Sequence, residues 1–481
     1  MRAVRKASSR PKESKGYSTI IIISWILVFF WFGFLIYCWR AGLLASVTLP
    51  SFTRGEENGF TDGTSFSADS QVVSRGPGVD IGSTIVQAKN DVHVIFSTDC
   101  STYQDWQSLL VFHSAMAVGQ KGHITRIASG CAEEKKSALT ELYHKLWPNY
   151  SVHFTPDFKK DEKTKKKYDF YNKPYGLRHW LQNAEPPLDN NVVIALIDPD
   201  FVFMRPLSTQ VKGQLSNLIS PPWKVEEIWE KAEKGKPVGQ TYGLGAPWVN
   251  DNHPKFGRGR ICGENSPCID VPNEREGGKY YSLGPPYIVQ KEDMVRIADS
   301  WCNFVPKVYE KYPHLLAEMY AYSMAAAHEN LPHLRMDNFM VSNTEAGGEG
   351  WQLVDSLEDP CALPVDGIFF PDKPLPTFLH YCQFFRVGEW AWGKRRMDKE
   401  IFSCDRPILA DLPKDLGSYD FIINKKGQKE HQSPRQTKRN AFMICTAYRA
   451  MNAALLDFKT RVCGPEANIQ KTINIAKLPT G

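Results

Sequence analysis

One apolar run, ended by two acids around a proline, limits most strongly what this chain can fold into. In the stretch NNVVIALIDPDFVFMRPL, residues 190–207, six apolar residues from Val192 to Ile197 stop at Asp198-Pro199-Asp200. A strand that is apolar on both faces is typical of a sheet covered by helices on both sides. Because proline lacks the donor that a central strand needs, it marks the exit from the sheet. We therefore expect a buried strand that presents two carboxylates at its carboxyl end.

Strand-like and helix-like segments alternate before this run. The strand and helix patterns follow in turn at residues 92–98, 103–119, 123–129, 132–147, 151–155 and 173–184. This alternation predicts an α/β fold with a mostly parallel, doubly wound sheet, in which ligands bind beyond the carboxyl ends of the strands. Residues 210–290 are rich in Pro and Gly and are expected to form long loops over that cleft rather than core. Further helices are expected at 295–312, 315–330 and 441–462, and a strand at 376–385.

The N-terminal region has the charge and hydropathy pattern of a membrane anchor. Residues 1–16 carry six basic side chains and one acid, whereas no charged residue lies between Lys15 and Arg40. Ser18 to Trp39 would form roughly 33 Å of helix, enough to cross a hydrocarbon layer of about 30 Å. A cleaved signal peptide is the alternative, but its apolar region normally has only ~7–15 residues. The preceding positive charge predicts a cytoplasmic N-terminus and a luminal body.

The organisation of the remaining chain can be predicted from this anchor. The formal net charge of the whole chain is +5, which residues 1–16 account for. The balanced remainder argues against nucleic-acid binding, which requires a basic face. Low apolar periodicity at 40–90 indicates a flexible stem. We predict a cytoplasmic tail (1–16), a transmembrane signal anchor (17–39), a luminal stem (40–90), a catalytic domain (91–400) and a C-terminal extension with a terminal helix (401–481).

Cysteine usage agrees with a luminal location. Ten of the 11 cysteines lie beyond the predicted anchor, and an even number fits disulfide bonds in an oxidising compartment. The short segment from Cys262 to Cys268 could close on itself. Zinc is the alternative for such spacing, but no Cys-x-x-Cys pair or histidine cluster accompanies it. Asn149-Tyr150-Ser151 is an acceptor pattern for N-glycosylation.

The two acids at the end of the buried strand suggest metal-assisted chemistry. Carboxylates suit Mn²⁺ or Mg²⁺, which complete their shell with substrate phosphates and water. A cation bridging a diphosphate offsets charge on the leaving group as its bond to a sugar breaks. Asp198 and Asp200 form the only Asp-x-Asp in the chain. An ordinary turn after the strand is the alternative explanation. The pattern favours a transferase that uses a nucleotide sugar.

Six short segments, in order, carry a resemblance to a known family. They are STDCSTYQDWQ (97–107), NKPYGLRHWL (172–181), DPDFVFMRPL (198–207), AEMYAY (317–322), HYC (380–382) and GEWAWGKRRMDK (388–399). The chain thereby resembles the hydroxyproline O-arabinosyltransferases, which share a domain with the peptidyl-serine α-galactosyltransferases. It departs from the arabinosyltransferases in its short path from HYC to GEW and in its loops at 210–280, which leaves the sugar and the acceptor open.

The resemblance implies a GT-A glycosyltransferase fold and a set of site residues. Asp198, Asp200 and His380 would hold Mn²⁺ or Mg²⁺. Asp200 would also be a catalytic residue. Glu318 would lie near the reacting bond and orient an acceptor hydroxyl or stabilise charge on the sugar. The donor would contact the following residues: Thr98, Asp99, Asn172, Lys173, Asp198, Gly284, Lys394 and Arg395.

Structural roles compete with each of these assignments. His380 could be an ordinary packed histidine, and Glu318 could stabilise a helix N-terminus. Capping explains Thr98, Asp99, Asn172 and Lys173 equally well. A turn before proline would account for Gly284, and a solvated basic turn would account for Lys394 and Arg395.

The resulting functional hypothesis is a type II Golgi membrane glycosyltransferase. It would transfer arabinose or galactose from a UDP-sugar to hydroxyproline or serine hydroxyls of secreted or cell-wall proteins, with retention of configuration. The alternative is a catalytically inactive glycosyltransferase-like Golgi protein that binds glycans or partners. A luminal metal-dependent hydrolase is less favoured, because the sequence offers no second cluster of histidines and carboxylates for a two-metal site.

Overall fold

The computed structural model describes residues 92–161, 165–211, 228–362, 374–424 and 426–474. Within these ranges no helix combines the length and apolar character needed to cross a bilayer. The predicted tail, anchor and stem at 1–90 lie outside the described residues. All of the described residues belong to one compact unit, Thr84–Gly481.

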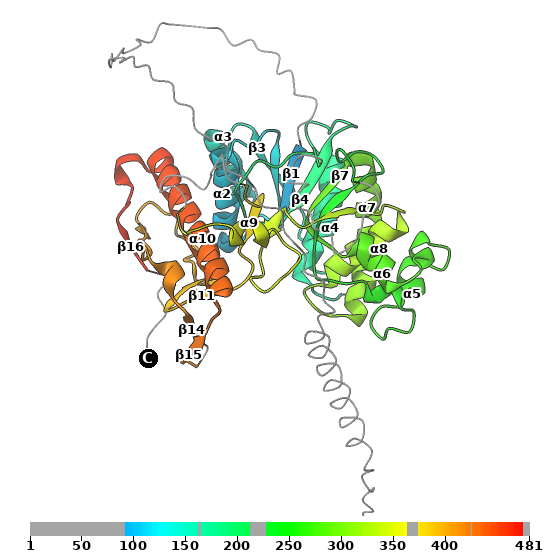
Figure 1. Ribbon diagram of the computed structural model, residues 1–481. Helices are drawn as coiled ribbons and strands as arrows, with labels where there is room; N and C mark the ends of the chain where they lie inside the picture. Colours follow the sequence, from blue (N-terminus) through cyan, green and yellow to red (C-terminus); the bar gives the residue numbers. More distant parts are fainter. Residues whose placement is uncertain (1–91, 162–164, 212–227, 363–373, 425, 475–481) are drawn as a thin grey trace, which may run out of the picture. The chain divides into compact units, whose positions relative to one another are not determined.

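A seven-stranded sheet forms the centre of the described chain (Figure 1), in the order β3-β2-β1-β4-β7-β6-β8. Its strands are β1 (Val92–Asp99), β2 (Ile124–Ser129), β3 (Tyr150–Thr155), β4 (Val193–Ile197), β6 (Val238–Thr241), β7 (Leu283–Gln290) and β8 (Leu334–Met336). The strands β3, β2, β1 and β4 pair in parallel, and only β7 runs antiparallel to its neighbours. The predicted α/β fold with a mostly parallel sheet is therefore confirmed.

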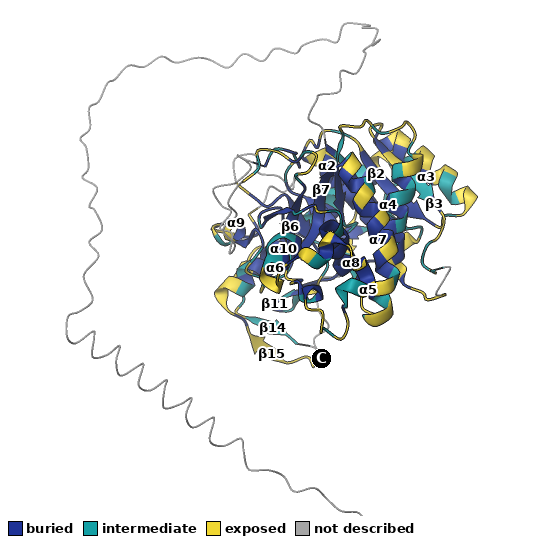
Figure 2. Ribbon diagram, turned by 90° about the vertical axis from the view of Figure 1, so that its right-hand side faces the viewer, coloured by how far each residue is buried: buried dark blue, intermediate teal, exposed yellow. Residues whose placement is uncertain are grey.

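Helices cover both faces of this sheet, which explains why β4 is apolar throughout and why successive apolar residues of β1 face opposite cores. Along β1, Val94 and Phe96 face one core, and Ile95 between them faces the other. The first core takes α2 (Thr102–Ala117), α3 (Glu133–Leu146) and α10 (Pro434–Val462). The second takes α4 (Asn172–Asn183), α7 (Lys291–Lys311) and α8 (Ala317–His328). Figure 2 shows the resulting pattern, in which the strands are buried and the outer helix surfaces are exposed.

The region 210–290 differs from its prediction. It contains β6 and β7, and every residue of β7 is buried in the centre of the sheet. Its short helices are α5 (Arg258–Cys262) and α6 (Glu274–Tyr281), with 3-10 turns at Pro247–Val249 and Pro267–Asp270. The two prolines of β7, Pro285 and Pro286, mislead the prediction. They lie in a register shift, because Gly239 pairs with Tyr287 whereas the next residue of β6 pairs with Gly284.

A smaller sheet joins the C-terminal half to the end of β4. It contains β5 (Phe201–Phe203), β10 (Phe378–His380) and β9 (Met340–Val341), in the order β5-β10-β9. The same half of the chain also contains α9 (Trp351–Asp355), β11 (Phe385–Val387), β12 (Trp390–Trp392), β13 (Ile408–Leu409), β14 (Phe421–Ile423), β15 (Lys429–His431) and β16 (Lys471–Ile473). Helix α10 packs against α2 and shares the first core with β1 (Figure 1). It begins at Pro434, earlier than the predicted helix at 441–462.

Four disulfide bonds use eight of the ten cysteines beyond the predicted anchor. The loop from Cys262 to Cys268 closes on itself as expected. The other three bonds are Cys100–Cys131, Cys361–Cys445 and Cys404–Cys463. Cys302 and Cys382 are free thiols. Asn149 of the glycosylation pattern is exposed immediately before β3.

Candidate active site

Strand pairing brings three predicted site residues together at the carboxyl end of β4. Asp198 and Asp200 follow β4 directly, and β10 pairs antiparallel with β5 so that His380 lies opposite Phe201. The backbone N–H of Tyr381 donates to the carbonyl of Asp200 at 3.1 Å, which fixes this register. One ligand atom from each of Asp198, Asp200 and His380 lies within 4.8 Å of the others. Residues that are far apart in the sequence thus share one site.

These three side chains have the chemistry of a divalent cation site. Two carboxylates and one imidazole suit Mn²⁺, and oxygen-rich sites with few protein ligands suit Mg²⁺. Asp200 and His380 are buried, and His380 Nε2 lies 3.3 Å from Asp200 Oδ1. Burial disfavours the charged ring, but Cys382 and Asp200 raise the pKa of His380 well above its usual value. A metal binds the neutral imidazole, so a bound cation would take the place of that proton. The three ligand types and their proximity fit a cation, and the geometry does not select between the two metals.

Two lysines neutralise the two aspartates. Lys173 Nζ lies 2.7 Å from Asp198 Oδ1, and Lys394 Nζ lies 2.5 Å from Asp200 Oδ2. Burial works against ionisation of Asp200, yet Lys394 and His380 hold the pKa of its carboxyl well below the usual range. A cation bound here would contact the carboxylates, and a diphosphate bound here would contact the neighbouring ammonium groups. The site thus offers partners for both the metal and the phosphates.

Glu318 belongs to the same cluster. It is the second residue of α8, and its Oε1 lies 3.1 Å from Lys173 Nζ. Its other oxygen, Oε2, is buried with no hydrogen-bond partner among the described residues. Burial raises the pKa of Glu318, although Lys173 opposes this. The backbone of Glu318 is held by the Trp301 indole, which donates to its carbonyl at 2.7 Å, and by the hydroxyl of Tyr168. A buried carboxylate oxygen without a partner is poised to accept a ligand hydroxyl.

The remaining predicted donor contacts lie on the β1 side of the aspartates. Thr98 is buried, and its hydroxyl accepts from Arg126 Nε at 2.8 Å. Asp99 accepts from the backbone and hydroxyl of Ser101 and pairs with Lys159 at 2.9 Å. Both side chains are therefore engaged in structural contacts of the kind that the capping explanation required.

Asn172 and Lys173 begin α4, and they divide between structural and site contacts. The amide oxygen of Asn172 accepts from the backbone N–H of Phe158 at 2.8 Å, so it fixes a loop. Its Nδ2 is buried without a hydrogen-bond partner in the described part of the chain. Lys173 reaches the acidic cluster, as its ion pairs with Asp198 and Glu318 show. Neither side chain caps α4, because the Asn172 amide bonds to a loop N–H outside the helix and Lys173 turns to the acids.

Gly284 and the basic pair near the C-terminus are also placed by the structure. A Cβ at Gly284 would lie 2.7 Å from a ring carbon of Tyr242, so the glycine leaves room for that ring. Lys394 reaches Asp200, whereas its neighbour Arg395 is exposed. The structure therefore brings Lys394 into the cluster and leaves the Arg395 side chain at the surface.

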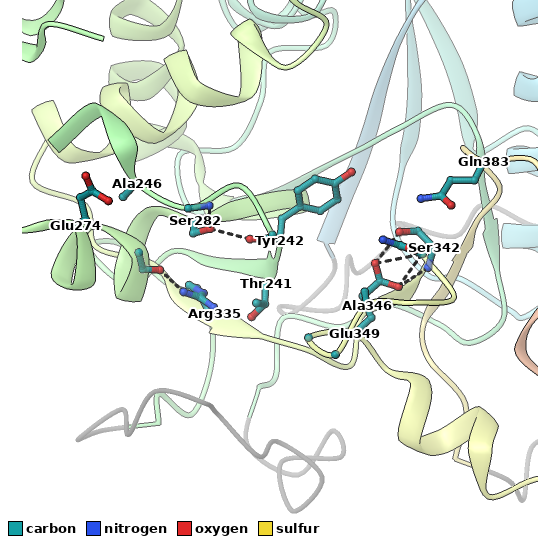
Figure 3. Close-up of a pocket in the computed structure, with 16 residues that line it drawn as sticks. Thr241, Tyr242, Ala246, Glu274, Ser282, Arg335, Ser342, Ala346, Glu349 and Gln383 are labelled. Carbon is teal, nitrogen blue, oxygen red and sulfur yellow. Dashed lines mark hydrogen bonds between the residues drawn. The ribbon is translucent and has the colours of Figure 1, made fainter. Parts of the chain in front are cut away.

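Several residues beside this cluster were not predicted from the sequence. Tyr242, Glu349 and Gln383 line a pocket of 640 Å³ (Figure 3). Glu349 is buried and accepts from the Ser342 hydroxyl at 2.6 Å. The run Gly347-Gly348-Glu349-Gly350 could have signalled this loop, since an acid among three glycines after an apolar strand is unusual. No comparable signal marks Tyr242.

Curated proteins that resemble this chain include glycosyltransferases named for peptidyl serine or hydroxyproline. No protein-family model matches the chain. Its curated relatives include a peptidyl serine alpha-galactosyltransferase of Arabidopsis thaliana, 26% identical over 66% of this chain and 33% of that protein. The enzyme of the same name from Chlamydomonas reinhardtii is 24% identical over 79% of this chain and 48% of that protein. The resemblance expected from the sequence is confirmed.

A second group of relatives matches over more of its own length. The hydroxyproline O-arabinosyltransferase NOD3 of Pisum sativum is 23% identical over 68% of this chain and 84% of that protein. The chain spans only about a third to a half of the two galactosyltransferases. Among solved structures, the galactosyltransferase LgtC superposes loosely, with a TM-score of 0.34 at 12% identity, over 68% of this chain and 99% of that chain.

Proposed function

We propose that this chain transfers a sugar from a UDP-sugar to serine or hydroxyproline hydroxyls of secreted proteins. The observation that carries the proposal is the cluster of Asp198, Asp200 and His380 at the carboxyl end of β4. Lys173 and Lys394 are in direct contact with it, and Glu318 pairs with Lys173. The curated relatives are named for transfer of galactose to peptidyl serine or of arabinose to hydroxyproline, which supports this acceptor class.

The roles of the residues follow from their contacts. Asp198, Asp200 and His380 would hold Mn²⁺ or Mg²⁺, which when bound would offset negative charge on the departing diphosphate. Lys394 and Lys173 would donate to diphosphate oxygens, because each already lies at a carboxylate of the pair. Thr98 and Asp99 would line the base and ribose side. Arg395 would add positive charge at the entrance, as an exposed group.

Glu318 would act at the reacting centre. Its free oxygen would accept a hydrogen bond from the hydroxyl of the peptide and orient that hydroxyl toward the sugar carbon. In a retaining transfer the new carbon–oxygen bond forms as the bond to the diphosphate breaks. The hydroxyl proton then passes to the departing phosphate oxygen, so no dedicated base is needed. Lys173 opposes the rise in the pKa of this carboxyl that burial causes, through its ion pair.

The location is part of the proposal. The basic tail and the apolar run at 17–39 support a type II anchor, and the disulfide bonds support an oxidising lumen. We therefore propose the Golgi membrane, where the acceptor would meet the enzyme during secretion.

The direct test is a donor screen with the full-length chain in detergent. Release of UDP is measured for a panel of UDP-sugars with serine- and hydroxyproline-containing peptides, with and without EDTA. At least one donor should give peptide-dependent turnover that EDTA and Asp200→Asn reduce by about 10²-fold or more. Asp411→Asn, which alters an exposed ion pair with Lys471, is the matched control and should leave turnover unchanged. Absence of turnover with every donor would contradict the proposal.

A further inference from the structure

The 640 Å³ pocket lies beside the acidic cluster, on the β7 side of β4, away from Thr98, Asp99 and Lys173. Its walls come from the end of β6 and the loop after it, α6, the residue before β7, β8 and the loop before α9 (Figure 3). Thr98 belongs to β1 and Lys173 to α4, which packs on β1 and β2. Because β1 and β7 flank β4 on opposite sides, the donor contacts predicted on β1 and α4 lie on one side of the aspartates and the pocket lies on the other. Gly284, in β7, lies on the pocket side. Pockets that bind ligands commonly measure about 300–1,000 Å³.

The charge of the pocket does not suit a diphosphate. Its charged lining residues are two acids, Glu274 and Glu349, and one base, Arg335. Two of these charges are used to build the walls. Glu349 accepts from the backbone and hydroxyl of Ser342, and Arg335 donates to the carbonyl of Gly278. The ligand would therefore meet mainly neutral polar groups and backbone. This lining suits a neutral, hydrogen-bonding ligand such as a peptide.

Glycines leave the pocket walls open. A Cβ built on Gly243, Gly278 or Gly347 meets no atom within 4 Å, and none of the three has a positive φ. Larger side chains are therefore absent at these positions although the fold would accept them. Exposed main chain at such positions can hydrogen-bond an extended peptide.

Tyr242 lines the pocket, beside Gly284 of β7. Its backbone is fixed by Ser282, whose hydroxyl donates to the Tyr242 carbonyl at 2.7 Å and accepts from Gly245 N–H at 2.8 Å. Its ring occupies the space that Gly284 leaves free. Burial raises the pKa of its hydroxyl, and Cys382, Asp198, Glu349 and Asp200 raise it further. The hydroxyl therefore interacts electrostatically with the acids of the cluster and with Glu349 of the pocket. In Figure 3 the ring lies between Ser282 and the Ser342–Glu349–Gln383 group.

We infer that this pocket seats the peptide segment around the acceptor hydroxyl, and that Tyr242 is the positioning residue that directs the hydroxyl toward Glu318 and the cation site. The inference rests on the proposed function and adds the location and chemistry of its acceptor site. It assigns the three open glycines as positions that leave room for the acceptor peptide.

The test uses the full-length chain and a short fluorescein-labelled peptide that contains serine and hydroxyproline. Peptide affinity is measured by anisotropy in the wild type, Gly347→Phe and Gly243→Phe, with UDP affinity as the internal reference. Filling the pocket should weaken peptide binding at least tenfold and leave UDP affinity within twofold. Gly259→Phe is the matched control, because Gly259 also has open space at Cβ but lies on α5 outside the pocket. Thermal melts check that each variant folds.

Tyr242 is tested through a split in kinetic constants. Gly284→Ala should displace the Tyr242 ring and raise the KM for peptide several-fold with little change in the KM for donor. Tyr242→Ala removes the ring and should change the two KM values in the same way. A merely structural role would lower melting temperature and change both KM values together. Unchanged peptide affinity in Gly347→Phe and Gly243→Phe would overturn the inference. That anisotropy result is readable even if no UDP-sugar is turned over, so failure of the pocket and failure of the proposed function are distinguishable.

Discussion

At the scale of single residues, Lys173 decides how two of the three acids can coexist in the site. It lies between Asp198 and Glu318, at 2.7 and 3.1 Å, and its own burial would otherwise disfavour the charge. Isolated buried charges cost several kcal/mol, whereas paired ones are tolerated. Lys394 serves Asp200 in the same way. The site is thus close to neutral before any ligand binds, which allows charged ligands to exchange partners with the lysines.

Glu318→Gln tests the role of the free carboxylate oxygen. The amide keeps the shape and the contact side toward Lys173, but it removes the negative charge. We expect kcat for peptide glycosylation to fall by about 10²–10³-fold while the KM for the donor changes little. Steady-state kinetics with the donor found in the screen provides the measurement. A kcat within threefold of the wild type would remove Glu318 from the reacting centre.

The residue types in the cluster were predictable, but their partners were not. Asp198 and Asp200 could be found because a buried strand ends at them. Lys394 and Arg395 are adjacent in sequence, yet only Lys394 reaches the cluster, since its side chain contacts Asp200 and that of Arg395 is exposed. Rotation along a short 3-10 turn decides this difference, and a sequence pattern does not encode it. Tyr242 and Glu349 were missed because each depends on loop geometry.

At the scale of elements, an ion-pair contact joins α9 to α10. Asp355 accepts from Arg439 Nε at 2.8 Å and from its Nη2 at 2.7 Å, and it also pairs with the exposed Arg435. The Arg439 guanidinium lies over the Trp351 ring at 4.8 Å. Bidentate pairs of this kind are stronger than ordinary surface ion pairs. The contact holds α10 against the segment that carries the Glu349 loop.

Asp355→Asn should lower the free energy of unfolding by about 1–3 kcal/mol, because it weakens charge-assisted hydrogen bonds to a buried arginine. The arginines lower the pKa of Asp355, even though burial opposes this. Its stabilising contribution is therefore full above the unfolded-state pKa and is lost as pH falls through the lower folded-state pKa. Urea denaturation at pH 7 and at acid pH measures both effects. Asp411→Asn is the control and should change stability by less than about 0.5 kcal/mol.

Element types were predicted better than their pairings. The alternation before Asp198 predicts the parallel half of the sheet correctly, because each strand and helix there is local. Strand β7 was interpreted as a loop, since Pro285 and Pro286 argue against a central strand. The register shift opposite Gly239 accommodates them. The position of His380 beside Asp200 depends on a pairing between distant parts of the chain, which no local pattern reveals.

At the scale of the whole molecule, three histidines make the fold sensitive to acid. Burial, with a neighbouring histidine in the first two cases, lowers the pKa of His93 to about 3, of His153 to about 4 and of His333 to about 3. The unfolded chain binds these protons near pH 6.5, whereas the folded chain does not. The stabilising contribution of these three histidines should therefore be full above about pH 6.5 and decline steadily as pH falls toward 4.

The decline is measured by urea denaturation between pH 7 and pH 4.5. By pH 5, each of these histidines should lower the free energy of unfolding by about 1–2 kcal/mol. When the chain unfolds at that pH, the three histidines together should bind about three protons. His93→Gln should remove roughly one proton from this uptake. His144→Gln, at an exposed position of α3, should leave the pH dependence as in the wild type. A pH profile of His93→Gln identical to the wild type would contradict this account.

The central claim is that Asp198, Asp200 and His380 hold a divalent cation to which a nucleoside diphosphate binds. Isothermal titration of UDP into the full-length chain, with Mn²⁺ and after chelation, tests it most directly. The account predicts that chelation weakens UDP binding at least tenfold in the wild type, and that Asp200→Asn binds UDP equally weakly in both conditions. If the wild type and Asp200→Asn bind UDP with the same affinity whether or not Mn²⁺ is present, the claim is wrong.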